Sequence, residues 1–400
     1  MIGIKANIGQ RPVGQGGLCR GSLKAFAANG QSEVFRWIYD CGSNQIDALK
    51  REIFALNGKR QDFLFLSHLD ADHINGVDAL LANCKEPREV VLPYLNDDQR
   101  LWVLGESASA GTATGSFLDF LGDTTAWFQK RGVARVTHVR SPDEDGQVDG
   151  TSRRADPSPE PGEFTAKWTV APKPLPEVPT VMGVDNGAAI VLTGHAEVAD
   201  WTFLPYTQVP PREKVRAFKD RLAAIFPGKP VGKIIDEART ASGRKALRDA
   251  YDALYSHHNN VSMSLYMGPL QSGLHKWRNE VFFTDWDWMR VGTGSVGWLV
   301  TGDADLKSVG RRNAFLRFYA DYLPNVDVFG LPHHGAATSF HPPLLNEMKA
   351  VRFVFAAAGP NRWGHPHAEV TDAVATDGSR FIHVNEEAGK ALEANLYHNT

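Results

Sequence analysis

The sequence predicts an α/β fold, and three observations favour it. Short apolar runs of strand-like composition, separated by turn residues, occur at both ends of the chain. Between them lie two segments, 212–226 and 242–255, whose apolar residues recur at the three- and four-residue spacing of amphipathic helices. Several strand-like runs lead directly into Asp or His, so we expect loops at strand ends to carry the chemistry.

The first part of the chain is expected to alternate strands with turns. A short helix is predicted at 78–83, and strands are predicted at 2–8, 34–39, 63–67 and 90–92. The glycine-rich segment from Val13 to Leu18 has two interpretations, a phosphate-binding loop or a hairpin bend. Because no Gly-Lys-Ser/Thr follows it, the hairpin is favoured.

The middle of the chain differs in composition from the rest. Residues 97–180 are expected to form an insertion, within which residues 141–163 are dense in Pro, Asp, Glu, Gly and Ser and predict a mobile loop. The helical segment 212–255 is predicted to pack over a sheet or to line the cleft like a lid. We treat residues 1–400 as a single domain, because the second half alone lacks a complete set of candidate site residues.

A dense cluster of metal-capable side chains follows the strand predicted at 63–67. His68, Asp70, Asp72 and His73 lie within six residues, between an apolar run and a Gly-containing turn into a helix. A loop at the carboxyl end of a strand can direct such side chains toward one point. The cluster therefore indicates half of a dinuclear metal site.

Three later strands supply candidates for the other half. They are predicted at 297–301, 326–331 and 351–357. Each is followed by polar residues able to bind a metal or substrate, namely Asp303, His333, His334, Asn361, His365 and His367. A carboxylate placed just after a buried strand is costly unless it has a partner such as a metal ion. Of the remaining histidines, only His195 is a further ligand candidate, because a Thr-Gly-His turn after a strand can supply one.

Composition excludes several classes of protein and site. The net charge is −3 and the pI is near 6.5, so a polyanion would have to be held by a local patch or by metal. Cys19, Cys41 and Cys84 form no Cys-x-x-Cys pair, which argues against a disulfide framework and a thiolate zinc site. No signal-peptide core or run of membrane-spanning length occurs, so a cytoplasmic protein with no membrane association is expected.

Together these motifs resemble the metallo-β-lactamase fold hydrolases. The pattern typical of that superfamily is His-x-His-x-Asp-His, followed late in the chain by a bridging Asp and a final His; here Asp70 replaces the second His. This variant is similar to the soluble hydrolase domain of ComEC, the bacterial competence DNA-uptake channel. The other motifs of this resemblance are Val-Gly-Gln-Gly near the N-terminus, Asn259-Asn260-x-Ser262, Thr-Gly-Asp303, Pro-His-His-Gly and Asn-x-x-Gly-His365-Pro.

The resemblance implies an αββα sandwich, in which two mixed β-sheets pack face to face with helices outside. It implies that His68 and Asp70 hold one metal, that Asp72 and His73 hold the other, and that Asp303 bridges both. The chain lacks the superfamily's Gly-His-Thr motif, so late histidines are expected to complete the ligands: His365, and either His334 or its neighbour His333. Further metal- or substrate-binding candidates are Asn259, Asn260, Asn361 and His367.

The implied chemistry is hydrolysis by a pair of divalent ions. Two such ions about 3.5–4 Å apart can share a bridging hydroxide and lower the pKa of water toward neutrality. They also stabilise the negative charge that builds on a phosphoryl or carbonyl oxygen. Asp70 makes the first site more anionic, so manganese stands beside zinc as a candidate. Asp72 and Asp303 are expected to be essential for catalysis.

The substrate implied by the resemblance is a phosphodiester, with single- or double-stranded DNA as the expected partner. Arginines and lysines in the insertion and at 212–221 are candidate phosphate contacts, although interleaved acidic residues favour a solvated helix face. The alternatives are a hydrolase of a small ester, lactone, amide or nucleotide, and a metal-stabilised module in a multi-component system. A nuclease is also expected to have a regulatory protein partner, which the sequence does not identify.

Overall fold

The computed structural model describes residues 3–26, 32–85, 87–141, 164–193, 201–255, 261–269, 277–283 and 288–399. Structural statements below concern these residues. The predicted mobile loop from residue 142 onward, His195, Asn259 and Asn260 lie outside the described residues.

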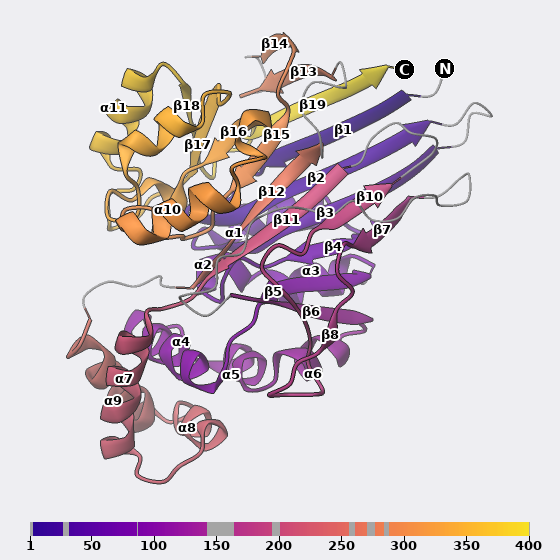
Figure 1. Ribbon diagram of the computed structural model, residues 1–400. Helices are drawn as coiled ribbons and strands as arrows, with labels where there is room; N and C mark the ends of the chain where they lie inside the picture. Colours follow the sequence, from indigo (N-terminus) through magenta and orange to yellow (C-terminus); the bar gives the residue numbers. More distant parts are fainter. Residues whose placement is uncertain are drawn as a thin grey trace.

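Two β-sheets pack face to face, and helices cover both outer faces (Figure 1). The larger sheet has the strand order β14-β13-β19-β1-β2-β3-β4-β5-β6-β9-β8, and the smaller has the order β18-β17-β16-β15-β12-β11-β10-β7. This arrangement confirms the predicted αββα sandwich. The two termini lie side by side, because β1 pairs with β19 along its whole length.

The strands of the larger sheet are β1 (Gly3–Gln10), β2 (Gly16–Phe26), β3 (Ser32–Ser43), β4 (Phe63–Phe65), β5 (Glu89–Pro93), β6 (Arg135–Arg140), β8 (Lys173–Pro174), β9 (Met182–Asp185), β13 (Trp277–Phe282), β14 (Trp288–Thr293) and β19 (Leu392–Asn399). Those of the smaller sheet are β7 (Thr165–Trp168), β10 (Ile190–Thr193), β11 (Trp201–Gln208), β12 (Ser262–Pro269), β15 (Gly297–Val300), β16 (Val326–Gly330), β17 (Phe353–Ala357) and β18 (Arg380–Val384).

The α-helices are α1 (Ile46–Phe54), α2 (Ala71–Ile74), α3 (Val77–Asn83), α4 (Asp97–Ala110), α5 (Gly115–Gly122), α6 (Thr124–Gln129), α7 (Arg212–Ile225), α8 (Val231–Glu237), α9 (Ala241–Asp252), α10 (Val309–Phe318) and α11 (Ala368–Asp377). A 3₁₀ turn, η2 (Pro332–Gly335), follows β16. A capping box between Asn96 and Gln99 begins α4, and Gly111 in the left-handed conformation ends it.

Apolar side chains fill the space between the sheets and the space under each helical layer. Between the sheets, Trp37 of β3 packs edge-on against Phe203 of β11, with ring centroids 4.9 Å apart. A second cluster joins the larger sheet to α1, α3 and α4, and a third joins the smaller sheet to α10 and α11. Burial of each large apolar side chain contributes roughly 1.5–3 kcal/mol, so these three layers hold the sandwich together.

The strands that carry the candidate site residues run parallel. In the larger sheet β3, β4, β5, β6 and β9 are successive parallel neighbours, and in the smaller sheet β15, β16, β17 and β18 are. The carboxyl ends of parallel strands meet at one edge of a sheet. Loops distant in sequence are therefore brought together there. The glycine-rich segment forms the predicted hairpin, since β1 and β2 pair antiparallel on either side of it.

Part of the predicted insertion, 97–180, is built into the larger sheet. Its strand β6 pairs in parallel with both β5 and β9. A parallel pair needs a long crossover connection, and α4, α5 and α6 provide it between β5 and β6. The sequence pattern did not predict this pairing, because local composition does not record which strands become neighbours.

The predicted helical segment packs against that crossover. Trp102 of α4 lies between Phe218 of α7 and Tyr251 of α9, at centroid distances of 6.1 and 5.2 Å. Gly105 lets α7 approach closely, because a Cβ there would lie 2.4 Å from the Phe218 ring. In Figure 1, α7, α8 and α9 extend the helical layer at the lower left.

Candidate metal centre

The early cluster lies at the carboxyl end of β4. All three residues of β4 are buried, and the chain leaves it through buried Ser67 and His68 before α2 begins at Ala71. Because α2 is a single turn, Asp72 and His73 are held close to the end of the strand. Hydrogen bonding of Met263 N to Ser67 O joins this loop to β12 of the facing sheet.

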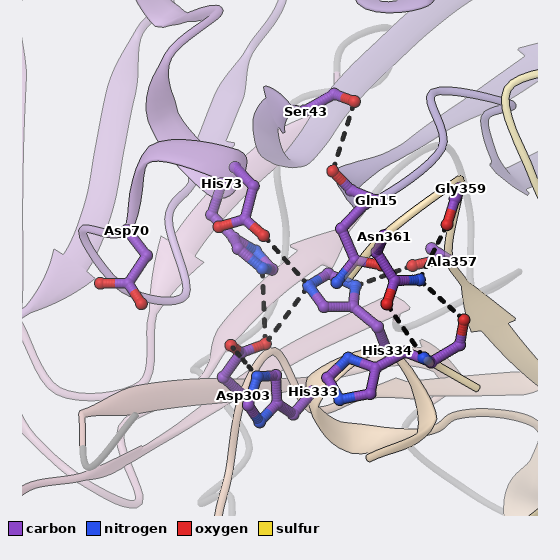
Figure 2. Close-up of polar contacts among 12 residues, drawn as sticks. Gln15, Ser43, Asp70, His73, Asp303, His333, His334, Ala357, Gly359 and Asn361 are labelled. Atoms are coloured by element: carbon purple, nitrogen blue, oxygen red, sulfur yellow. Dashed lines mark hydrogen bonds and ion pairs between the residues drawn. The ribbon is translucent and has the colours of Figure 1, made fainter. Parts of the chain in front are cut away.

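Asp303 lies among histidines from both halves of the chain. Its Oδ2 is 3.5 Å from His68 Nε2 and 3.8 Å from His333 Nε2. Its Oδ1 is 3.4 Å from His73 Nε2 and 4.0 Å from His334 Nε2. Figure 2 shows the Asp303 carboxylate with His73, His333 and His334 around it. The two oxygens thus face different pairs of imidazoles, which is the geometry of a bridging carboxylate.

Two groups of three side chains have ligand atoms near enough to share a metal ion. One is His68, His73 and Asp303, and the other is Asp72, His73 and His334; within each, the ligand atoms lie within 4.8 Å of one another. Asp72 Oδ2 lies 3.3 Å from His334 Nε2. Imidazole and carboxylate ligands in this ratio suit zinc and manganese. His73 belongs to both groups, whereas the sequence resemblance assigned it to the Asp72 site alone.

Hydrogen bonds fix which ring nitrogen of two histidines faces the centre. His334 Nδ1 lies 2.7 Å from the carbonyl oxygen of Ala357, and a carbonyl can only accept, so Nδ1 carries the proton. His73 Nδ1 donates in the same way to Asp40 Oδ2, at 2.8 Å. In each neutral ring the lone pair is then left on Nε2, which points at Asp303.

His68 follows the same rule through a hydroxyl. The Ser67 hydroxyl donates to Asp40 Oδ2 at 2.7 Å, so its oxygen accepts from His68 Nδ1 at 2.8 Å. The Nε2 atoms of His68, His73 and His334 are all buried and have no hydrogen-bond partner in the described part of the chain. A buried polar atom without a partner costs about 1–3 kcal/mol, so three such atoms around one carboxylate form a candidate cation-binding site.

Asp40 is the residue of this centre that the sequence pattern missed. It is 1% exposed, adopts a positive φ of 59°, and its carboxylate holds the Ser67 amide and hydroxyl as well as His73. Such a strained backbone in a residue other than glycine is uncommon and clusters at functional sites. In the sequence, Asp40 directly follows the strand predicted at 34–39. It is far from the metal-capable cluster along the chain, so nothing in the sequence placed it in the centre.

Two glycines permit α2 to lie against the β2–β3 pair. A Cβ on Gly17 would lie 2.7 Å from Asp40 Cβ and 3.0 Å from His73 Nδ1. A Cβ on Gly42 would lie 2.5 Å from the backbone of His73 and Ile74. Gly17 of the glycine-rich turn and Gly42 therefore leave room for His73 to meet Asp40.

The electrostatics of the centre favour positive charge. Burial lowers the pKa of His73, but the Asp303 and Asp40 carboxylates raise it well above its ordinary value. Burial raises the pKa of Asp72, but its close contact with the His334 imidazole and the charge of His73 bring it down to about 2. The carboxylates therefore stabilise cationic partners, and a divalent ion would supply the charge that they favour.

Ser262 holds Asp303 in position. Its hydroxyl accepts from Asp303 N at 3.0 Å and donates to Thr301 O at 3.0 Å. Between these two residues Gly302 has a φ of +53°, and a Cβ there would lie 2.6 Å from Ser262 Oγ. The serine of the Asn-Asn-x-Ser motif thus fixes the backbone at Asp303 from the neighbouring strand.

Three predicted ligands, Asp70, His333 and His365, lie next to the two groups of three but belong to neither. Asp70 Oδ2 is 3.7 Å from His68 Nε2, and Figure 2 shows Asp70 to one side of the cluster. His333 donates or accepts at Ser339 Oγ through Nδ1, at 3.2 Å, and turns Nε2 toward Asp303. The His365 ring lies 5.0 Å from the His333 ring, outside both groups of three.

Asn361 and His367 hold backbone rather than face the centre. Asn361 donates to the carbonyls of Gly359 and His365, and its Oδ1 accepts from the amides of Trp363 and His365. His367 Nδ1 accepts from Ala337 N at 3.0 Å. These contacts fix the loop after β17, so both residues shape the rim of the site.

Comparison with known proteins agrees with this geometry. Residues 35–165 match the family model described as the metallo-beta-lactamase superfamily. This segment contains β3, β4 and the whole early cluster. Over these residues the chain is therefore similar to the metallo-beta-lactamase superfamily. Over this segment the match agrees with the superfamily that the sequence predicted, whereas the ComEC-like resemblance stays a prediction.

A long form RNase Z from yeast aligns in structure with a TM-score of 0.34 and 12% identity over 97% of this chain. The chain spans 41% of the length of that protein. A search of curated proteins gives no match. In the described part of the chain, no helix is long and apolar enough to cross a membrane.

Proposed function

We propose that this protein is a dinuclear metal-dependent phosphodiesterase that acts on DNA. The observation that carries the proposal is the set of three buried Nε2 atoms, of His68, His73 and His334, directed at the two oxygens of Asp303. Two divalent ions bound there would activate water at neutral pH and stabilise negative charge on a phosphoryl oxygen. Zinc and manganese are the candidates.

The residues of the chain have distinct roles in this proposal. His68 and Asp70, with Asp303 Oδ2 and His333, would form one metal site. Asp72, His73 and His334, with Asp303 Oδ1, would form the other. Asp40 and Ser67 keep the imidazole protons on Nδ1, so the ring nitrogens that face the centre remain ligands.

Support for a phosphodiester comes from the carboxylate content and from the sequence motifs. Three carboxylates, Asp70, Asp72 and Asp303, stand beside the histidines, and oxygen-rich pairs of sites suit the in-line displacement of a phosphoryl oxygen. The Asp70 variant of the motif is the one that resembles the ComEC hydrolase domain. A regulatory protein partner remains part of the proposal for a nuclease.

The test is elemental analysis of the purified protein combined with an assay supplemented with zinc or manganese. Single-stranded DNA, duplex DNA and a simple phosphodiester are compared with a small ester and a lactone. We expect about two metals per chain and cleavage of the phosphodiesters, lost in Asp303→Ala. Ester or lactone turnover without phosphodiester turnover would show that the protein is a small-molecule hydrolase instead.

A protein that binds no metal under these conditions would contradict the dinuclear centre itself. Asp62→Asn is a matched control, because Asp62 is also a buried carboxylate of the larger sheet region but accepts from the Arg36 amide and contacts no histidine of the centre. It should retain metal and turnover.

A further inference from the structure

A line of aromatic rings connects the buried centre with the surface. The His73 and His334 rings lie 5.3 Å apart, His334 and His365 lie 6.4 Å apart, and His365 and Trp363 lie 6.2 Å apart. The last two pairs are close to parallel, at 26° and 22°. Centroid distances of this size are those of offset stacking. Trp363 therefore stands at the outer end of a ladder that begins at a candidate metal ligand.

The exposure of Trp363 distinguishes it from the buried tryptophans. Trp363 is 49% exposed. By contrast, the almost fully buried tryptophans are Trp37, Trp102, Trp201, Trp277 and Trp298. Leaving a large indole surface in water forgoes the free energy that burial would supply. An exposed tryptophan beside a candidate active site is therefore expected to gain that free energy from a ligand.

The loop that carries Trp363 is held rigidly. Four hydrogen bonds of the Asn361 side chain close it on itself, as part of Figure 2 shows. Gln45 Nε2 donates to Pro360 O at 3.0 Å, and His367 N donates to Gly335 O at 3.1 Å. The ring is thus presented in one place before any ligand binds, which lowers the entropic cost of binding.

A cation lies beside the same ring. The Arg362 guanidinium carbon is 5.0 Å from the centroid of the Trp363 ring, and Arg362 is exposed. An indole face and a guanidinium group together suit a ligand in which a flat aromatic ring adjoins an anion. A nucleotide unit, with its base next to a phosphate, has this chemistry. A small aliphatic ester or lactone does not.

We infer that Trp363 and Arg362 form a nucleotide-binding platform at the rim of the metal centre, which stacks a base of the strand and contacts its adjoining phosphate. This inference rests on the proposed phosphodiesterase function and narrows its substrate to base-bearing single strands, because a base paired in a duplex cannot lie flat on the indole. Trp363 and Arg362 are specificity-determining residues in this role and take no part in the bond-breaking step.

The test measures binding and cleavage separately. A fluorescently labelled single-stranded oligodeoxynucleotide and an abasic strand of equal length are titrated by anisotropy against the wild-type protein, Trp363→Ala, Trp363→Phe and Phe54→Ala. Phe54, the last residue of α1, is 71% exposed. It lies at the opposite end of that helix from Gln45, which contacts the Trp363 loop. Phe54→Ala is therefore the control for loss of an exposed aromatic ring. Circular dichroism of each variant reports its folding.

The wild-type protein should bind the base-bearing strand more tightly than the abasic one. Trp363→Ala should weaken binding of the base-bearing strand by about 5- to 150-fold, the range for loss of one base–aromatic stack, and leave the abasic strand unchanged. Trp363→Phe should restore most of the affinity, and Phe54→Ala should have no effect. For cleavage, KM should rise in Trp363→Ala while kcat changes little.

Arg362→Gln tests the phosphate contact. It should weaken both strands equally and lower the slope of log affinity against log salt concentration by about one. An unchanged slope would remove Arg362 from the platform.

The two proposals fail in different ways. Cleavage with equal affinity for base-bearing and abasic strands would overturn the platform and leave the phosphodiesterase standing. Base-dependent binding that Trp363→Ala abolishes, without phosphodiester cleavage at any metal, would overturn the phosphodiesterase and leave the platform.

Discussion

Asp303 and Asp327 are both buried carboxylates of the smaller sheet, one just after β15 and the other within its neighbour β16, yet their surroundings differ. Asp327 is fully buried, and its Oδ1 accepts from Arg352 Nε at 2.6 Å while its Oδ2 accepts from Asn279 Nδ2 at 2.5 Å. Asn279 belongs to β13 of the other sheet, so this group joins the two sheets. Asp303 instead faces four imidazoles.

The difference lies in what remains unsatisfied. Around Asp327 the protein itself supplies a cation and an amide, so the charge is balanced within the fold. Around Asp303, three imidazole nitrogens are buried with no hydrogen-bond partner in the described part of the chain. A balanced buried charge contributes to structure, whereas an array of buried lone pairs needs a ligand to complete it.

The largest expected effect separates the two carboxylates by activity. Asp303→Asn should bind less metal and lose about 10²- to 10⁴-fold in turnover, because it removes a charged bridging group from the centre. Asp327→Asn should keep its metal content and turnover. Elemental analysis and initial rates on the same preparations measure both, and equal losses in the two variants would show that the two carboxylates do not differ in function.

The pH dependence of the free energy of unfolding tests the surroundings of Asp327. Burial raises the pKa of Asp327 to about 6, although its bonds to Arg352 and Asn279 oppose the shift. The folded state therefore holds this proton at pH values where the unfolded chain has released it. The stabilisation is complete below about pH 4 and is lost as pH rises to 6, by roughly 3 kcal/mol for a shift of this size.

The variant that checks this titration is Asp327→Asn. Asn279 Oδ1 has no hydrogen-bond partner among the described residues, so a flipped Asn279 amide can accept from the new amide. The difference in free energy of unfolding between variant and wild type, measured with chelator present between pH 4 and 7, should change in favour of the variant as pH rises. A difference independent of pH would show that Asp327 does not titrate in this window.

The smallest expected effect lies in the support of the metal ligands. Asp40→Asn disturbs the acceptor that holds the His73 Nδ1 proton and the Ser67 hydroxyl, and loss of such an outer partner costs about 10- to 100-fold in metal affinity. Competition with a chromogenic chelator measures the affinity, with Asp62→Asn as the buried control. If both variants bind metal like the wild type, Asp40 has only a structural role.

The local sequence pattern was enough to predict these strands and the metal-capable side chains that follow them. The apolar run before His68 is β4, and the runs before Asp303, His333 and His365 are β15, β16 and β17. These predictions succeed because an apolar strand and the polar residue after it are neighbours in the chain. The hairpin at the glycine-rich turn was predicted for the same reason.

The mixed sandwich itself was predicted through the family resemblance, but the place of β6 within the larger sheet was not. That pairing joins Glu89 of β5 to Arg135 of β6 across a helical crossover, a relation that no local pattern records. The role of Asn361 in holding its own loop could not be predicted from the sequence either, because the sequence does not show whether an Asn side chain faces a ligand or the backbone.

By itself the sequence determined that several strands would end in metal-capable side chains, among them His68, Asp303 and His334. Only the tertiary structure decided that Asp40 would meet His73, that Asp303 would divide four histidines between its two oxygens, and that Trp363 would stay exposed at the end of a line of rings. The physical reason is that proton position, bridging and exposure depend on contacts between strands far apart in the chain, which sheet pairing and packing bring together.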